Sequence, residues 1–102
     1  MNETFTISSM RNSSDEVVGI LKSLANTDRL LILCYIAKQE LNVAQIEQLT
    51  QIGQPTLSQQ LMILRRNNMV TTRRDGKQIF YRLKDANLFT LLDTLHELYC
   101  KK

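Results

Sequence analysis

The feature that most constrains this chain is the run at positions 53–64, which reads Gly-Gln-Pro-Thr-Leu-Ser-Gln-Gln-Leu-Met-Ile-Leu. Leu57, Leu61 and Leu64 recur at i, i+4 and i+7, which is the spacing of a helix with one buried stripe. Pro55 suits the first position of such a helix, where its missing N–H costs no hydrogen bond. The run therefore predicts an amphipathic helix that an apolar stripe anchors to the core.

The opposite face of this predicted helix carries hydroxyls and amides rather than Lys and Glu. Gln side chains match the N6 and N7 atoms of adenine, and Ser or Thr bonds several base edges. We therefore expect this face to read bases in a DNA groove; the alternative is an uncharged exposed helix without a partner. The residues expected to contact DNA here are Gln54, Thr56, Ser58, Gln59 and Gln60.

The length of 102 residues allows one domain with a single core. Its apolar fraction of 43% is that of a soluble globular protein, and no apolar run approaches the roughly 18 residues of a membrane span. Residues 1–9 contain neither a basic segment nor an apolar core, so we expect no signal peptide, no membrane partner and a cytoplasmic location. In that compartment both cysteines are expected to be reduced at rest.

The net charge of +3 is unevenly distributed along the chain. Between Glu47 and Asp85 the only acid is Asp75, and seven Arg and Lys residues give this segment a charge of +6. The remainder of the chain therefore carries −3. A basic segment of this kind is typical of a surface that binds a polyanion such as DNA.

The residues before the run predict a tail and two helices. Residues 1–12 lack an apolar period, which predicts a mobile N-terminal tail. Ser13, with Glu three residues later, matches a capping box and starts a first helix that should end near Ala25. Asn26 then caps a second helix through Lys38, which is apolar on most sides and should lie in the middle of the domain.

A short third helix is predicted over 43–50, because Asn42 and Gln45 repeat the capping pattern. A brief turn that contains glycine separates it from the helix of the run. Two helices joined in this way form a helix-turn-helix motif, whose second helix enters the major groove. The inward-facing residues of the third helix are expected to be Ala44, Ile46 and Leu49.

The segments at 69–74 and 77–83 flank Asp75-Gly76, a pair that favours a two-residue hairpin turn. A β-hairpin directly after a recognition helix is a wing. Alternate apolar residues of the second strand should face the core, and basic residues near the tip should reach phosphates or a minor groove. The basic residues expected to contact DNA are Arg65, Arg73, Arg74 and Lys77.

Asp85 predicts the start of a last helix with a long apolar stripe. This stripe consists of Leu88, Leu91, Leu92, Leu95 and Tyr99. It exceeds what one small domain buries, so we expect a homodimer through the first and last helices. The predicted fold is mainly α, within the α+β class: a winged helix-turn-helix with five helices and a two-stranded wing, in which residues 13–102 form one DNA-binding and dimerisation domain.

Residues 24–30, 53–61 and 73–83 resemble the ArsR/SmtB family of dimeric winged-helix repressors, and the resemblance extends over nearly the whole chain. It implies that a free dimer binds double-stranded operator DNA and leaves it when an inducer is sensed. Many family members carry His at the position of Gln60 and Gly at that of Asn68, so the base preference does not transfer.

The resemblance leaves the inducer open. Metal-sensing members use Cys pairs near the helix-turn-helix or His and Asp pairs on the last helix. Here the third helix has no Cys, and the last helix offers Asp93 and His96, which are more ordinarily a surface pair. A metal or metalloid sensor is the first alternative, although two thiolates fall short of the three or four ligands of a closed soft-metal site. The sequence thus indicates neither a metal nor another cofactor.

Cys34 in the second helix and Cys100 at the end of the last resemble the cysteine pair of the family's persulfide-sensing branch. This implies that a reduced dimer binds DNA, and that reactive sulfur species or other oxidants link the two sulfurs, as a disulfide or a longer polysulfide, and release it. The alternative is that Cys34 is a small core residue and Cys100 a chance terminal thiol. An enzyme is less expected, because the sequence has no nucleophile-and-base grouping, no Cys-x-x-Cys and no Gly-rich phosphate loop.

Overall fold

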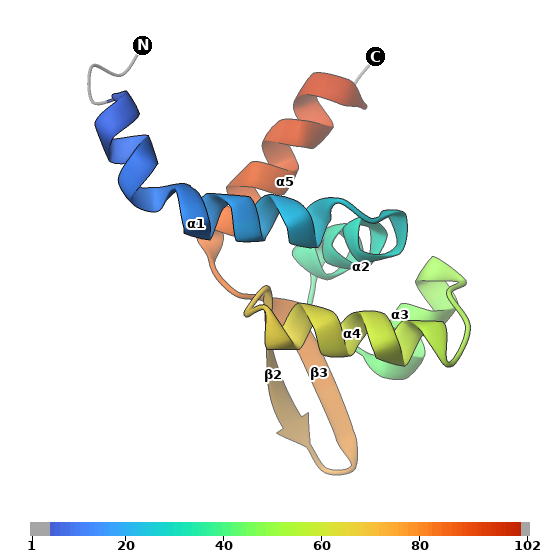
Figure 1. The fold of residues 1–102 in the computed structure, drawn as a ribbon. Helices are drawn as coiled ribbons and strands as arrows, with labels where there is room; N and C mark the ends of the chain where they lie inside the picture. Colours follow the sequence, from blue (N-terminus) through green and yellow to red (C-terminus); the bar gives the residue numbers. More distant parts are fainter. Residues whose placement is uncertain (1–4, 101–102) are drawn as a thin grey trace.

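The structure, a computed structural model, describes residues 5–100. Five helices and a three-stranded antiparallel sheet of order β1-β3-β2 form a winged helix-turn-helix, which confirms the predicted fold (Figure 1). The elements are α1 (Ile7–Leu24), α2 (Thr27–Lys38), β1 (Leu41–Asn42), α3 (Val43–Thr50), α4 (Thr56–Arg66), β2 (Val70–Asp75), β3 (Gln78–Leu83) and α5 (Ala86–Tyr99). Among the described helices, none is long and apolar enough to cross a membrane.

Helix α2 lies at the centre of the domain, as its apolar sequence predicts. It contacts α1, α3, α4 and β3, and its Ile32 and Leu33 are completely buried. Leu57, Leu61 and Leu64 of α4 are buried against the same core, which confirms the apolar stripe predicted to anchor this helix. The wing and α4 lie on one side of this core, while the free ends of α1 and α5 extend away on the other side (Figure 1).

Three predicted helix caps are present. The side chain of Asn26 accepts a hydrogen bond from the Arg29 N–H, and Asn42 forms the full capping box with Gln45 at the start of α3. Asp85 caps α5 by accepting from the Leu88 N–H at 2.9 Å, and this bond is the main cause that lowers the pKa of its carboxyl group. The stabilisation by Asp85 is therefore present above the ordinary carboxyl pKa and is lost as the pH falls.

Helix α1 begins earlier than predicted. Its cap is Thr6, whose Oγ1 accepts from the Ser9 N–H at 3.0 Å, and Ser13 lies inside the helix. Thr6 and Ser13 are both suitable caps, so the hydroxyl pattern did not distinguish them. The predicted mobile tail over 1–12 is thus wrong for residues 7–12, which are helical, and residues 1–4 lie outside the described part of the chain.

The wing is the predicted two-stranded hairpin of β2 and β3, but its turn differs from the prediction. Asp75 pairs with Gln78, so the two-residue loop is Gly76-Lys77 rather than Asp75-Gly76. Gly76 has φ +65°, and glycine with positive φ at the first loop position is the arrangement of a type II′ hairpin turn. The sheet gains a third strand because Leu41 and Asn42 pair with β3.

The N-terminal end of α4 differs from the prediction, and its C-terminal end agrees with the sequence. Helix α4 begins at Thr56, and Pro55 occupies the N-cap position instead of the first helical position. At the other end Asn68 has φ 59°, the left-handed conformation that commonly ends a helix and that asparagine tolerates. The Asn68 N–H bonds to the Arg65 carbonyl and the Met69 N–H to the Leu64 carbonyl, which together form a Schellman motif.

The predicted inward faces of α3 and α5 are only partly correct. In α3 only Ile46 is buried, while Ala44 and Leu49 are exposed because the short helix turns one narrow face to the core. In α5 Leu88 and Leu92 belong to the core of a single chain, so this part of the stripe needs no partner. The large apolar side chains that α5 leaves exposed are Phe89, Leu98 and Tyr99.

We expect Asn42→Ala to lower the free energy of unfolding by about 1 kcal/mol, because it removes the cap of α3. Chemical denaturation followed by circular dichroism measures this loss. The matched control is Asn12→Ala, which changes an exposed asparagine inside α1. An equal loss in both variants would contradict a capping role for Asn42.

Candidate DNA interface and thiol pair

The exposed face of α4 contains both free and internally bonded side chains. Thr56 and Gln59 are exposed, and neither makes a side-chain hydrogen bond to another described residue. Gln54, by contrast, accepts from the backbone N–H of Ser58 at 3.2 Å and from its hydroxyl at 2.7 Å. The Gln54 amide thus caps α4 in place of Pro55, and its amide oxygen is engaged within the chain.

Gln60, which the sequence places among the base-reading residues, is half-buried and turned toward α2. Its Oε1 accepts a hydrogen bond from Nη1 of Arg29 at 3.0 Å. A side chain held in this way is poorly placed to reach a base edge. The pattern of α4 alone could not reveal this contact, because the partner lies on another helix.

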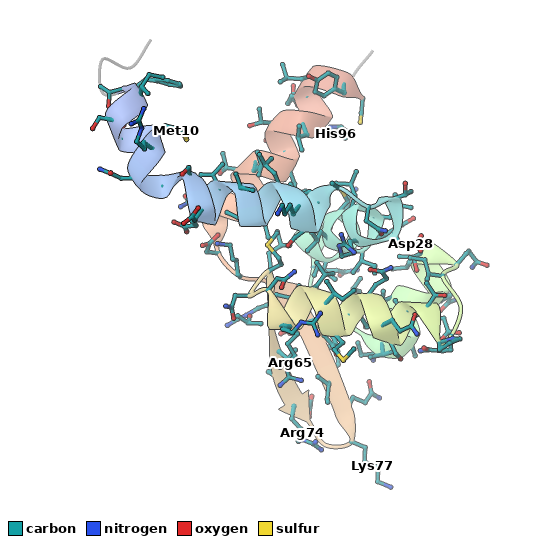
Figure 2. The ribbon with its side chains drawn as sticks, in the orientation of Figure 1. Met10, Asp28, Arg65, Arg74, Lys77 and His96 are labelled. Atoms are coloured by element: carbon teal, nitrogen blue, oxygen red, sulfur yellow. The ribbon has the colours of Figure 1, made fainter. Side chains whose placement is uncertain are left out.

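The basic side chains of the wing are of two kinds. Arg73 forms an ion pair with Glu40, with 2.8 Å between Nε and Oε1, and its guanidinium lies 4.7 Å from the centre of the Phe80 ring. Arg74 and Lys77 lie near the tip. The Lys77 side chain makes no hydrogen bond or ion pair with another described residue, and Arg74 makes only a 3.5 Å contact to a backbone carbonyl. These two and Arg65 of α4 lie at the end of the molecule opposite Met10 and His96 (Figure 2).

Cys34 and Cys100 are both free thiols in exposed residues. Cys34 lines a cavity of about 280 Å³ between α2 and α5, together with apolar and polar side chains of both helices. Cys100 follows His96 of that cavity by one helical turn, and its N–H bonds to the His96 carbonyl at 2.9 Å. The other residues that line the cavity are Ala37, Lys38, Phe89, Leu92, Asp93 and His96.

The pKa of Cys34 is raised above that of an ordinary thiol. The larger cause is burial of the sulfur against the cavity wall, which disfavours the thiolate, and the second is the negative charge of the Cys100 thiolate. Cys34 as a whole residue is exposed, but its pKa depends on the immediate surroundings of the sulfur atom, which are partly buried. The two cysteines therefore interact electrostatically across α2 and α5.

Sequence reasoning did not associate Lys38 and Phe89 with Cys34. A usable signal existed, because Lys38 follows Cys34 by four residues, and Phe89, His96 and Cys100 follow one another at helical spacing. Which face of α5 meets α2 is a tertiary property that this spacing does not contain. Within residues 5–100, no group of three or more His, Cys, Asp or Glu side chains is arranged to hold a metal ion.

A helix-turn-helix whose second helix is followed by a basic β-hairpin defines a winged-helix DNA-binding protein. A family model described as bacterial regulatory protein, arsR family, matches residues 26–72, from the cap of α2 into β2. Together with the relatives below, this match shows that the chain belongs to the ArsR family of bacterial regulatory proteins.

The biofilm growth-associated repressor of Xylella fastidiosa is 44% identical over 91 residues, which cover 89% of this chain and 80% of that protein. The crystal structure of the transcriptional repressor BigR from Xylella fastidiosa has a TM-score of 0.90 and 42% identity, covering 96% of this chain and all of the other. Reduced HlyU from Vibrio cholerae has a TM-score of 0.84 and 36% identity, covering 93% and 100%. The homodimeric winged helix-turn-helix domain of a possible ArsR-family regulator from Mycobacterium bovis has a TM-score of 0.78 and 27% identity, covering 95% and 89%.

The Xylella fastidiosa relatives are named as repressors and HlyU of Vibrio cholerae as a transcriptional activator, and the chain shares their family and fold along most of its length. It is therefore a DNA-binding regulator rather than an enzyme.

The free side chains of α4 and the wing should differ in how they contribute to DNA binding. Gln59→Ala should relax sequence preference, because a base contact is lost, whereas Arg74→Ala should weaken binding to all duplexes and lower the slope of log K against log salt by about one. Fluorescence anisotropy at several salt concentrations measures both effects. Arg11→Ala, on the exposed surface of α1, removes the same charge far along the chain from the wing. A slope change in Arg11→Ala equal to that in Arg74→Ala would mean that the wing is not a phosphate contact.

The raised pKa of Cys34 predicts the pH dependence of its alkylation. Because only the thiolate reacts, the rate with iodoacetamide should reach its midpoint at a higher pH than that of free cysteine. In Cys100→Ser the midpoint should move down but stay above that of free cysteine, since burial is the larger cause. Peptide mass spectrometry measures the rate, and a wild-type midpoint at or below that of free cysteine would contradict this assignment.

Proposed function

We propose that this chain is a homodimeric transcriptional repressor that binds operator DNA while Cys34 and Cys100 are reduced and leaves it when the two sulfurs become linked. The observation that carries this proposal is that Cys34 of α2 lines a cavity between α2 and α5. His96 of α5 lines the same cavity, and Cys100 follows His96 by one helical turn. The similarity to relatives named as repressors supports the direction of regulation.

Exposed apolar side chains on α1 and α5 support a dimer through these helices. Ile7 is 69% exposed and Leu21 52% on α1, and Leu98 is 67% exposed on α5. Apolar patches of this kind on a small domain mark protein interfaces, and their burial contributes about 25 cal/mol per Å². A structural neighbour of this chain is itself described as homodimeric.

The proposed inducer is a reactive sulfur species, represented here by a persulfide RSSH. The thiolate of one cysteine attacks the terminal sulfur, which leaves a cysteine persulfide and releases RSH. The second thiolate attacks the cysteine sulfur of that persulfide, forms a disulfide and releases hydrogen sulfide. The two thiols lose two electrons in total, the terminal sulfur is reduced to sulfide, and the thiol protons end on RSH and hydrogen sulfide. Insertion of further sulfur gives a longer polysulfide bridge.

Linkage of the two sulfurs ties the central helix to the proposed dimer helix α5. Reading helices of a symmetric dimer must stand about 34 Å apart to enter successive major grooves, so a small rotation of one helix pair weakens binding. A coupling free energy of about 3 kcal/mol lowers affinity more than a hundredfold, which is the upper end of ordinary allosteric coupling. A covalent bond between α2 and α5 can supply it.

The thiol switch predicts the behaviour of two single variants. Cys34→Ser and Cys100→Ser should each bind a duplex from the promoter of the chain's own gene like reduced wild type, and should stay bound after glutathione persulfide is added. Wild type should release the duplex and rebind it after dithiothreitol. Mobility-shift titration measures binding, and intact mass measures the linkage. Release by either Ser variant at the wild-type dose would overturn the paired switch, and stoichiometric arsenite binding with release would favour a metalloid sensor.

The dimer predicts a change of mass on substitution at the interface. Wild type at micromolar concentration should sediment at about twice the 11.8 kDa of one chain, and Leu98→Glu should shift it toward the monomer. The control is Leu49→Glu, an exposed leucine of α3 that is outside the proposed interface. A wild-type monomer, or equal dissociation by Leu49→Glu, would contradict this interface.

A further inference from the structure

The guanidinium of Arg29 joins three elements of the fold. From the first turn of α2, its Nε donates to the Ser23 carbonyl at 2.8 Å and its Nη2 to the Lys22 carbonyl at 3.1 Å, both at the end of α1. Its Nη1 donates to Oε1 of Gln60 on α4 at 3.0 Å. Carbonyls in the last turn of a helix lack the usual partner four residues on, although the Lys22 carbonyl also accepts from the Ala25 N–H at 3.3 Å. The planar fork of arginine can bond several acceptors in one fixed geometry.

A second hydrogen bond joins the same end of α1 to the end of α4. Nδ2 of Asn67 donates to Oγ of Ser23 at 3.3 Å, and that hydroxyl in turn donates to the Gly19 carbonyl at 3.0 Å. Ser23 is the buried polar residue of the described chain, with 1% of its surface exposed. Gln60 and Asn67 lie seven residues apart on α4, so both project from the same face of the helix toward α1 and α2.

We infer that Arg29 and Gln60 are positioning residues for DNA recognition, which set the orientation of α4 relative to α1 without touching DNA. The leucine stripe of α4 holds the helix against the core, but apolar contact is non-directional and allows it to rotate and slide. Hydrogen bonds from one guanidinium to α1 and α4 restrict both movements. Because α1 belongs to the proposed dimer interface, this junction of Ser23, Arg29, Gln60 and Asn67 also sets the separation of the two reading helices.

This inference rests on the proposed DNA-binding function and assigns Gln60 a role that differs from base reading. A reading glutamine uses its amide both as donor and as acceptor, whereas a positioning Gln60 needs only the Oε1 acceptor that faces Arg29. Glutamate keeps that acceptor and adds a charge that pairs with Arg29, but it cannot donate to a base, and phosphates repel it. The two roles therefore predict opposite effects of the same substitution.

The test compares Gln60→Leu, Gln60→Glu and Arg29→Lys for binding to the promoter duplex and to a scrambled duplex. We expect Gln60→Leu and Arg29→Lys to lose about tenfold in specific affinity with non-specific affinity unchanged, and Gln60→Glu to stay within about threefold of wild type. Thermal unfolding and sedimentation on each variant establish that fold and assembly are intact.

A structural measurement gives an independent readout in the full-length dimer. A spin label on Met62→Cys, in a chain that also carries Cys34→Ser and Cys100→Ser, reports the distance between the two reading helices, since Met62 is 57% exposed on α4. The distance distribution should broaden with Gln60→Leu and narrow again with Gln60→Glu.

Equal loss in Gln60→Glu and Gln60→Leu would show that Gln60 reads bases and would overturn the inference, as would wild-type affinity and discrimination in Gln60→Leu. Failure of the proposed function gives a different result, because the wild-type chain itself would then not discriminate the promoter duplex from the scrambled one.

Discussion

The burial of α2 is the constraint on which the rest of this structure depends. Its Ile32 and Leu33 are fully buried, and α1, α3, α4 and β3 all pack against it. The next residue along the helix, Cys34, is rotated by about 100° and lines the cavity against α5. Helix α2 therefore carries both the Cys34 thiol and Arg29, which bonds to Gln60 of α4. A movement of α2 caused by a change at the sulfur would also move Arg29.

Local patterns in the sequence predicted what local interactions determine. The caps Asn26, Asn42 and Asp85 each bond a backbone N–H within three residues, and all three are found where the pattern indicates. The start of α1 was missed because Thr6 and Ser13 are both residue types that cap helices. In the structure Thr6 is the cap, and Ser13 lies inside the helix. Local rules thus identify candidate boundaries, and packing decides among them.

Contacts between distant segments were beyond prediction from one sequence. Strand β1 exists because Leu41 and Asn42 pair with β3, and Gln60 turns inward because Arg29 meets it from another helix. In the same way, the α5 stripe indicated an interface, but the core of a single chain already buries Leu88. In the first two cases the contact joins residues that are at least 30 positions apart in the sequence. In the third, the packed core as a whole covers the side chain.

The position of Cys34 has opposite effects on the two steps of the proposed switch. Burial and the charge of Cys100 raise the pKa of Cys34, so little thiolate is present at neutral pH and its reaction with general electrophiles is slow. The proximity that produces this repulsion also makes closure of the sulfur bridge intramolecular, which gives the second step a high effective concentration. When one cysteine has become a persulfide, its inner sulfur is the electrophile that the thiolate of the other cysteine attacks in the proposed second step, and hydrogen sulfide leaves. In the proposed switch, the raised pKa of Cys34 therefore slows the first attack by that thiol, whereas the placement of both cysteines in one chain speeds closure of the bridge.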